Sequence, residues 1–184
     1  MAPTHHQAIA SAKTTLILGG ARSGKSAYAE KLAMESSRRK LYIATAEALD
    51  SEMRERIVLH QKRRGDEWTT LEIPLAIADA IAAPAHQDAV ILVDCLTLWL
   101  SNLMHYGWNI TETTERLAHS LKQTEAQIIL VSNEVGQGIV PDNALARQFR
   151  DEAGLLHQKI AAIAESVVWM VAGIPTFIKG SHNG

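Results

Sequence analysis

The sequence predicts an α/β fold with a mainly parallel sheet, and three observations lead to this prediction. Short apolar runs alternate with helical segments along the chain, a pattern typical of parallel sheets covered by helices. The segment Gly19-Gly20-Ala21-Arg22-Ser23-Gly24-Lys25-Ser26 matches G-x-x-x-x-G-K-[ST], the phosphate-binding loop. Residues 167–171 and 176–178, joined through Gly173-Ile174-Pro175, predict a closing antiparallel hairpin.

The phosphate-binding motif has the local setting that its chemistry requires. An apolar run at 14–18 predicts a buried strand before the loop, and residues 26–37 predict a helix after it. Gly19, Gly20 and Gly24 would let backbone N–H groups approach a phosphate without side-chain collisions. Lys25 would contact the β- and γ-phosphates, and Ser26 would offer its hydroxyl to Mg²⁺. This strand-loop-helix order disfavours the alternative of an ordinary glycine-rich turn.

A charged helix is predicted after the second strand, and it carries a histidine. The run 41–45 predicts the strand, and basic residues 38–40 are expected to end the first helix. In the predicted helix 51–64, Met53, Ile57 and His60 lie on one apolar stripe. Spacing alone favours a partly buried histidine with a polar partner.

The next segments predict an edge strand, a helix and a central strand. The edge strand spans 68–73 with Glu72 near its end facing solvent, and an alanine-rich helix at 75–83 follows Pro74. The continuous apolar run 89–94 ends in Asp94, where a phosphate-loop protein holds Mg²⁺. Capping of the following helix, 96–106, is the alternative role for Asp94.

The last third of the chain predicts a helix at 111–124, a buried strand at 128–131 and a long helix at 144–165. Between the last two lies a polar, glycine-punctuated loop, 132–143, which is expected to bind ligand. Arg147 and Arg150 lie on the end of the long helix that is next to this loop.

The length and composition of the chain narrow the possible domain organisation and function. The 184 residues suit one domain at 14–184 after a flexible tail at 1–13. A net charge of −2 with 21% charged residues gives no nucleic-acid footprint. No run of 18 apolar residues predicts a membrane span. The single cysteine, Cys95, cannot form an internal disulfide and lies in an apolar run, so a small buried side chain in a reduced, cytoplasmic protein is expected.

The residues alone leave three uses for a Mg²⁺-dependent nucleotide site. A guanine-nucleotide switch is disfavoured, because Ser132-Asn133-Glu134-Val135 stands where Asn-Lys-x-Asp is expected. A RecA-like ATPase module that moves a polymer lacks a basic or aromatic track. A small-molecule kinase or nucleotidyltransferase needs only the loop, the metal and a second pocket.

Five ordered blocks resemble the bifunctional adenosylcobinamide kinase / adenosylcobinamide-phosphate guanylyltransferase family of cobalamin biosynthesis. The resemblance covers Leu16 to Lys179. The blocks are Gly19 to Ser26, Tyr42-Ile43-Ala44-Thr45, Asp50-x-Glu52-Met53 with Arg56-Ile57 and His60, Val93-Asp94-Cys95-Leu96-Thr97, and Asn133-Glu134-Val135-Gly136-x-Gly138-Ile139-Val140-Pro141.

The resemblance implies two reactions and a set of site residues. The hydroxyl of adenosylcobinamide is phosphorylated with ATP or GTP, and GMP from GTP is then transferred to that phosphate through a guanylylated histidine. His60 stands at the histidine's position, which reverses the interpretation from spacing. The implied catalytic residues are His60 and Lys25, and the implied metal ligands are Ser26 and Asp94. The implied nucleotide contacts are Gly19, Gly20, Ala21, Arg22, Ser23, Gly24, Lys25, Ser26, Ala44, Thr45, Ala46, Gln61, Lys62, Arg63, Arg64, Glu72 and Asp94.

The same resemblance implies a RecA-like three-layer phosphate-loop NTPase fold and a homotrimer. Two stretches depart from the family pattern and support no functional statement: the tail before Thr14 and residues 107–114. A single-activity kinase or a RecA-like ATPase module stays the alternative function.

Overall fold

A seven-stranded sheet forms the centre of the molecule in the computed structural model, which describes residue 9 and residues 11–47 and 65–180. The strand order is β3-β2-β4-β5-β1-β6-β7. All neighbouring strands pair in parallel except β6 and β7, which form an antiparallel hairpin. The strands are β1 (Thr14–Gly19), β2 (Arg39–Ala44), β3 (Trp68–Glu72), β4 (Ala89–Asp94), β5 (Gln127–Asn133), β6 (Ser166–Val171) and β7 (Ile174–Lys179).

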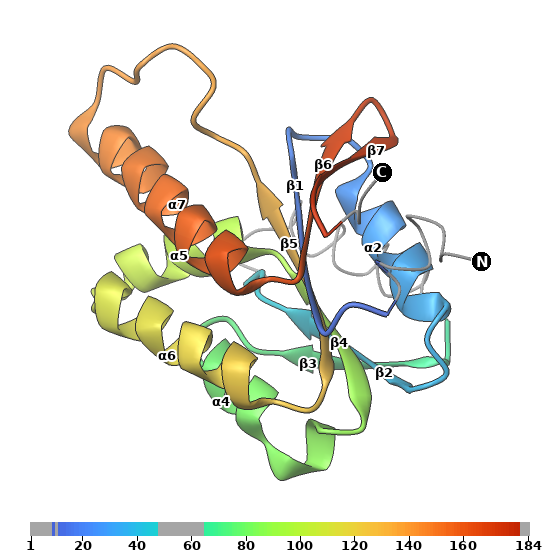
Figure 1. The fold of residues 1–184 in the computed structure, drawn as a ribbon. Helices are drawn as coiled ribbons and strands as arrows, with labels where there is room; N and C mark the ends of the chain where they lie inside the picture. Colours follow the sequence, from blue (N-terminus) through green and yellow to red (C-terminus); the bar gives the residue numbers. More distant parts are fainter. Residues whose placement is uncertain (1–8, 10, 48–64, 181–184) are drawn as a thin grey trace.

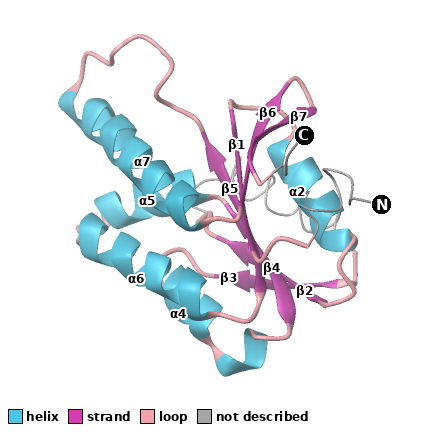
Figure 2. Ribbon diagram, viewed as in Figure 1, coloured by secondary structure: helices cyan, strands magenta, loops and turns pink. Residues whose placement is uncertain are grey.

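In the described part of the chain, helices cover the two faces of the sheet unequally (Figures 1 and 2). One face carries α2, and the other carries α4, α5, α6 and α7. The helices are α2 (Lys25–Met34), α4 (Ile77–Ala82), α5 (Leu96–His105), α6 (Ile110–Gln123) and α7 (Ala144–Ile163), with a 3₁₀ helix, η1 (Pro84–His86), before β4.

Each central strand contributes side chains to two hydrophobic cores. In β4, for example, Ile91 and Val93 face the core under the four-helix layer, whereas Val90 and Leu92 face the core under α2. A strand buried on both faces needs an uninterrupted apolar run, because successive side chains point to opposite faces. This requirement explains the sequence of β4.

Capping residues begin two of the helices. The side chain of Asn109 accepts a hydrogen bond from the backbone of Glu112 at the start of α6. Asn143 does the same for Ala146 at the start of α7. These caps satisfy N–H groups that have no partner within the helix, so they fix where each helix begins.

The predicted fold class is confirmed: the molecule is α/β, mainly parallel, with a C-terminal antiparallel hairpin. The boundary at 38–40 was wrong, because α2 ends at Met34 and the basic residues do not cap it. Arg39 and Lys40 instead begin β2, where Arg39 pairs in register with Ala89 and forms an ion pair with Asp88. The predicted helix 51–64 lies outside the described residues.

The segment expected to be a flexible tail has a described part that packs against the protein. Ile9 and Ala12 are buried, and Ile9 belongs to the core under α2. The backbone N–H of Lys13 donates to the Glu165 carboxylate at 2.7 Å, which fixes the chain at the entrance to β1. Within the described ranges, no helix has the length and apolarity needed to cross a membrane.

Candidate active site

The carboxyl ends of the six parallel strands β1 to β6 meet at one edge of the sheet. In this register Ala44 lies beside both Glu72 and Asp94, and Gly19 lies beside Asn133. Strand β5 separates β1, which carries the phosphate-binding loop, from β4, which carries Asp94. Two strand spacings, about 10 Å, therefore separate β1 from β4. In open α/β sheets, ligands bind in the crevice outside this edge.

The phosphate-binding loop has the conformation that its glycines predict. Gly24 has a φ of 95°, and an added Cβ would lie 3.2 Å from the Cα of Gly173. At Gly19 an added Cβ would lie only 2.6 Å from the carbonyl oxygen of Met170. Neither position tolerates a side chain without movement of the backbone. Helix α2 begins at Lys25, so its first N–H groups and its positive dipole end face the loop.

The side chain of Lys25, the first residue of α2, reaches back to the loop. Its ammonium donates hydrogen bonds to the Gly20 carbonyl oxygen at 2.5 Å and to Ser23 Oγ at 3.3 Å. Burial lowers the pKa of Lys25, whereas the charge of Asp94 opposes that shift. Lys25 follows β1 and Asp94 ends β4, so the two predicted residues lie at the same edge of the sheet on either side of β5, near enough for the charge of Asp94 to act on Lys25.

Asp94 ends β4 half-buried at the same edge. The hydroxyl of Tyr42 donates to its Oδ2 at 3.1 Å. Mg²⁺ prefers oxygen ligands and is often held by one or two protein groups together with waters and substrate phosphates. The Ser26 hydroxyl at the start of α2 and the Asp94 carboxylate therefore fit a Mg²⁺ site by their chemistry. Capping of α5 is not seen, because its N-cap is Cys95 and no side chain caps that helix.

Thr45 joins the end of β2 to the end of β4. It is fully buried, and its hydroxyl donates to the Cys95 carbonyl oxygen and accepts from the Cys95 N–H, each at 2.8 Å. The amide of Asn102 donates to the Thr45 carbonyl oxygen at 2.8 Å. The Thr45 N–H also donates to the Asp94 carbonyl oxygen at 3.3 Å, so the hydroxyl and both backbone groups of this residue are engaged within the protein.

Some of the remaining predicted nucleotide contacts lie in the described part of the chain, and others lie outside it. Ala44 is buried, Ala46 is half-buried, and Glu72 is exposed as expected at the edge strand β3. His60 and Gln61, Lys62, Arg63 and Arg64 lie outside the described residues. Cys95 is buried, as expected, and burial together with the nearby Asp94 raises the pKa of its thiol.

The two arginines that begin α7 have local partners. Arg147 donates to the carbonyl oxygens of Pro141 and Asp142, which holds the preceding loop against the helix. Arg150 forms an ion pair with Asp151 at 2.8 Å.

The sequence analysis did not predict a polar cluster that forms between β5 and α7. His157 on α7 is 7% exposed, and its Nε2 lies 2.7 Å from the Oγ of Ser132. Its Nδ1 lies 3.9 Å from Oε2 of Glu134. A histidine on the inner face of a predicted long helix was the available signal, but the sequence does not show which residue of the sheet it faces.

The phosphate-binding loop between β1 and α2, with a lysine inside it and a carboxylate two strands away, defines a phosphate-loop nucleotide-binding domain. The profile of the family described as cobinamide kinase / cobinamide phosphate guanyltransferase matches residues 15–178. The chain belongs to this family.

Two relatives are similar over nearly their whole lengths. The bifunctional adenosylcobalamin biosynthesis protein CobP of Pseudomonas aeruginosa is 50% identical over 167 residues, which cover 90% of this chain and 96% of that protein. The bifunctional adenosylcobalamin biosynthesis protein CobU of Escherichia coli is 40% identical over 179 residues, which cover 89% of this chain and 98% of that protein.

Solved structures of lower sequence identity share the fold. The flagellar accessory protein FlaH from Methanocaldococcus jannaschii superposes with a TM-score of 0.51 at 13% identity, over 91% of this chain and 78% of that chain. An ATPase from the type III secretion system of pathogenic bacteria gives a TM-score of 0.52 at 12% identity, over 90% of this chain and 56% of that chain. These similarities place the chain in the phosphate-loop ATPase fold.

Proposed function

We propose that this chain phosphorylates the hydroxyl of adenosylcobinamide with ATP or GTP and then transfers GMP from GTP to the resulting phosphate, giving adenosylcobinamide-GDP. The observation that supports the proposal is the position of Lys25 and Asp94 at the same edge of the sheet in a chain of this family. We expect the same phosphate-binding loop to serve both reactions, because each uses a nucleoside triphosphate.

The kinase step relies on positioning and on charge. The N–H groups at the start of α2 hold the phosphates, and the Lys25 ammonium neutralises charge that develops on the transferred group. Ser26 and Asp94 would hold Mg²⁺, which supplies further charge neutralisation when it is bound. The Tyr42 hydroxyl keeps the Asp94 carboxylate oriented toward this edge.

For the guanylyl transfer, the proposed nucleophile is the neutral imidazole of His60. One ring nitrogen attacks the α-phosphorus of GTP, and pyrophosphate leaves from the opposite side. The phosphoramidate is then attacked by the phosphate of the corrinoid substrate. Protonation of the ring removes the attacking lone pair, so we expect the transfer to slow below about pH 6.5, the unperturbed pKa of histidine.

Labelling tests this function directly. The protein is incubated with GTP carrying ³²P at the α-phosphate, and label on the chain is tested for acid lability and base stability. We expect acid-labile label in the wild-type protein and none in His60→Ala, with His86→Ala as a matched histidine control far from the site. Label retained in His60→Ala would overturn the assignment of the nucleophile. Nucleotide binding without any label would favour the single-activity kinase or an ATPase module.

We further propose a cytoplasmic homotrimer. Exposed apolar side chains on the loop after β5 and on the first residues of α7 support self-association, since Ile139 is 97% and Leu145 66% exposed. Light scattering after size-exclusion chromatography measures the mass, and Ile139→Asp should lower it to that of the monomer. A monomeric wild-type protein would contradict the trimer without affecting the chemistry.

A further inference from the structure

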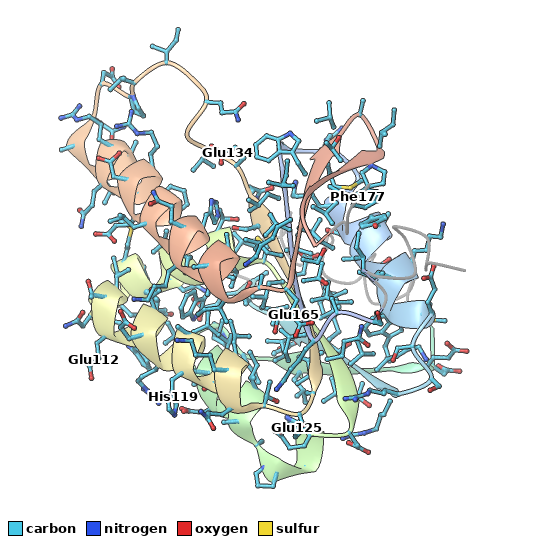
Figure 3. The ribbon with its side chains drawn as sticks, in the orientation of Figure 1. Glu112, His119, Glu125, Glu134, Glu165 and Phe177 are labelled. Atoms are coloured by element: carbon cyan, nitrogen blue, oxygen red, sulfur yellow. The ribbon has the colours of Figure 1, made fainter. Side chains whose placement is uncertain are left out.

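Glu134 has no role in the function described so far, although it lies beside the phosphate-binding loop. It follows β5 directly, and its backbone N–H donates to the carbonyl oxygen of Gly19, the first residue of the loop, at 3.0 Å. Figure 3 shows Glu134 at the end of β5, where the connection to α7 leaves the sheet. Because β5 lies between the loop strand and the Asp94 strand, its end lies between the phosphate and metal positions.

The Glu134 side chain is held from two directions. One carboxylate oxygen, Oε1, accepts a hydrogen bond from the N–H of Gly136. The other, Oε2, faces Nδ1 of His157 at 3.9 Å. With 20% of its side chain exposed, Glu134 is held in place and still open to solvent. A partly exposed, oriented carboxylate can accept a proton from a substrate.

Ser132, His157 and Glu134 have the order of a serine-histidine-carboxylate triad, but a hydrolase role does not fit. The hydroxyl of Ser132 lies 2.7 Å from Nε2 of His157, as in a triad. However, Ser132 is fully buried, so no substrate reaches its oxygen. The accessible member of the cluster is the carboxylate. Ser132 therefore orients the imidazole, and the imidazole faces Glu134.

The other described carboxylates that follow parallel strands at this edge are less suitable. Asp94 accepts from Tyr42 and fits the metal. Glu47, which follows β2, accepts from the Tyr106 hydroxyl at 3.1 Å. Glu72 ends β3, four strands from β1 in the sheet order, which corresponds to about 19 Å. Glu134 alone of these four is hydrogen-bonded through its backbone to the loop.

We propose that Glu134 is the general base of the kinase step and that His157 is a positioning residue for it. This inference rests on the proposed kinase activity. The substrate hydroxyl gives its proton to the Glu134 carboxylate while its oxygen forms a bond to the γ-phosphorus. The bond between the γ-phosphorus and the bridging oxygen breaks, and the electron pair leaves with the nucleoside diphosphate. Glu134 then releases the proton to solvent.

The two half-reactions make this role testable, because only the kinase step removes a proton from a hydroxyl. Glu134→Gln keeps the side-chain size and a hydrogen-bond acceptor but cannot take up the proton. We expect kcat for phosphorylation of adenosylcobinamide to fall by about 10²-fold or more. Labelling of the chain by α-³²P-GTP should stay within about threefold of wild type, since the imidazole nucleophile needs no base.

Glu125→Gln is the matched control. Glu125 is an exposed carboxylate near the opposite end of β5, away from the phosphate-binding loop (Figure 3). It should leave both half-reactions unchanged. Equal loss of both half-reactions in Glu134→Gln would overturn the proposal, because that result assigns the residue to shaping the loop. Unchanged phosphorylation would overturn it as well. A wild-type protein without kinase activity would instead refute the proposed function.

His157→Gln separates positioning from folding. Glutamine can still bond Ser132 but presents no imidazole to Glu134. We expect kcat of the kinase step to fall about tenfold, with KM for the nucleotide and the guanylylation rate both unchanged. A purely structural role would instead raise KM or slow guanylylation in parallel, and that result would remove His157 from the proposal.

Discussion

The Tyr42 hydroxyl donates a hydrogen bond to Oδ2 of Asp94 at 3.1 Å, across the junction of β2 and β4. The two residues come from strands that are paired in register, so the sheet itself sets this geometry. A carboxylate that accepts one such bond keeps its other lone pairs for a cation. The relationship explains how one aspartate can be oriented without a second charged partner.

We expect substitutions of this pair to change the dependence on Mg²⁺. Asp94→Asn removes the charge and should raise the Mg²⁺ concentration for half-maximal activity by more than tenfold, which is about 1.4 kcal/mol. Tyr42→Phe should raise it by a few fold, because the carboxylate remains but loses its orientation. Tyr106→Phe, which loses a similar hydroxyl contact to Glu47, is the control and should leave the Mg²⁺ titration unchanged. A titration unaffected in Asp94→Asn would remove this residue from the metal site.

Lys25→Met should weaken nucleotide binding without unfolding the protein. A hydrogen bond to a charged group contributes about 1.5–3 kcal/mol, so we expect the Kd for GTP to rise by roughly 10- to 100-fold. The increase in melting temperature caused by a fixed GTP concentration should shrink accordingly. Lys122→Met, on the exposed end of α6, should retain the full increase. An undiminished increase in Lys25→Met would contradict the placement of the phosphates.

Two glycines in the loop should differ in their tolerance of alanine. Gly24→Ala forces a residue with a Cβ to a φ of 95° and crowds Gly173, so we expect a loss of about 1–3 kcal/mol in the free energy of unfolding. Gly20→Ala meets no atom within 4 Å and has no positive φ, so its loss should stay below about 0.5 kcal/mol. Urea denaturation measures both. Equal losses would show that the loop relaxes around Gly24.

Acidification should destabilise the protein through His157. Burial lowers the pKa of this histidine below 6.5, and the charge of Glu134 only partly opposes the shift. The unfolded chain therefore binds a proton more readily than the folded chain, so this contribution to stability is present above pH 6.5 and is lost as the pH falls below it. The free energy of unfolding, measured by urea between pH 7.5 and 5, should decrease less in His157→Gln than in wild type. Parallel pH profiles would contradict a buried neutral imidazole.

Cys95 should be unreactive in the native protein. Burial and the charge of Asp94 raise the pKa of the thiol, so little reactive thiolate is present at neutral pH. Iodoacetamide should leave the native chain unmodified at pH 7.5 and add one carbamidomethyl group in guanidinium chloride, as measured by intact mass. The chain has a single cysteine, so the assay needs no variant. Rapid native labelling would contradict the buried position.

Local patterns predicted most of the strands, because a strand buried on both faces has an unmistakable composition. The run Ala89–Asp94 agrees residue for residue with β4. The end of α2 was less accurate, because basic residues suit a helix end and a strand start equally well. Arg39 is part of a strand because it pairs with Ala89 on β4. The sequence around Arg39 does not show that partner, which lies 50 residues further along the chain.

The candidate site likewise has features that the sequence predicts and features that only the assembled sheet shows. The phosphate-binding loop and Asp94 are recognisable from a motif and from a strand end. The strand order is not, so the sequence does not show that β5 inserts between them and brings Glu134 to the loop. The partners of His157, Thr45 and Tyr42 likewise come from distant segments, and only the assembled sheet identifies them.

The phosphate-binding loop is encoded near one end of this sequence, but its shape depends on residues near the other. The N–H of Gly173, in the turn between β6 and β7, donates to the carbonyl oxygen of Ser23 at 3.0 Å. The carbonyl oxygen of Met170, in β6, also lies so close to Gly19 that a Cβ added there would be 2.6 Å from it. During synthesis, the ribosome must therefore release the last hairpin before the loop reaches its final shape. A partly synthesised chain should bind GTP poorly, which delays nucleotide capture until the sheet is complete.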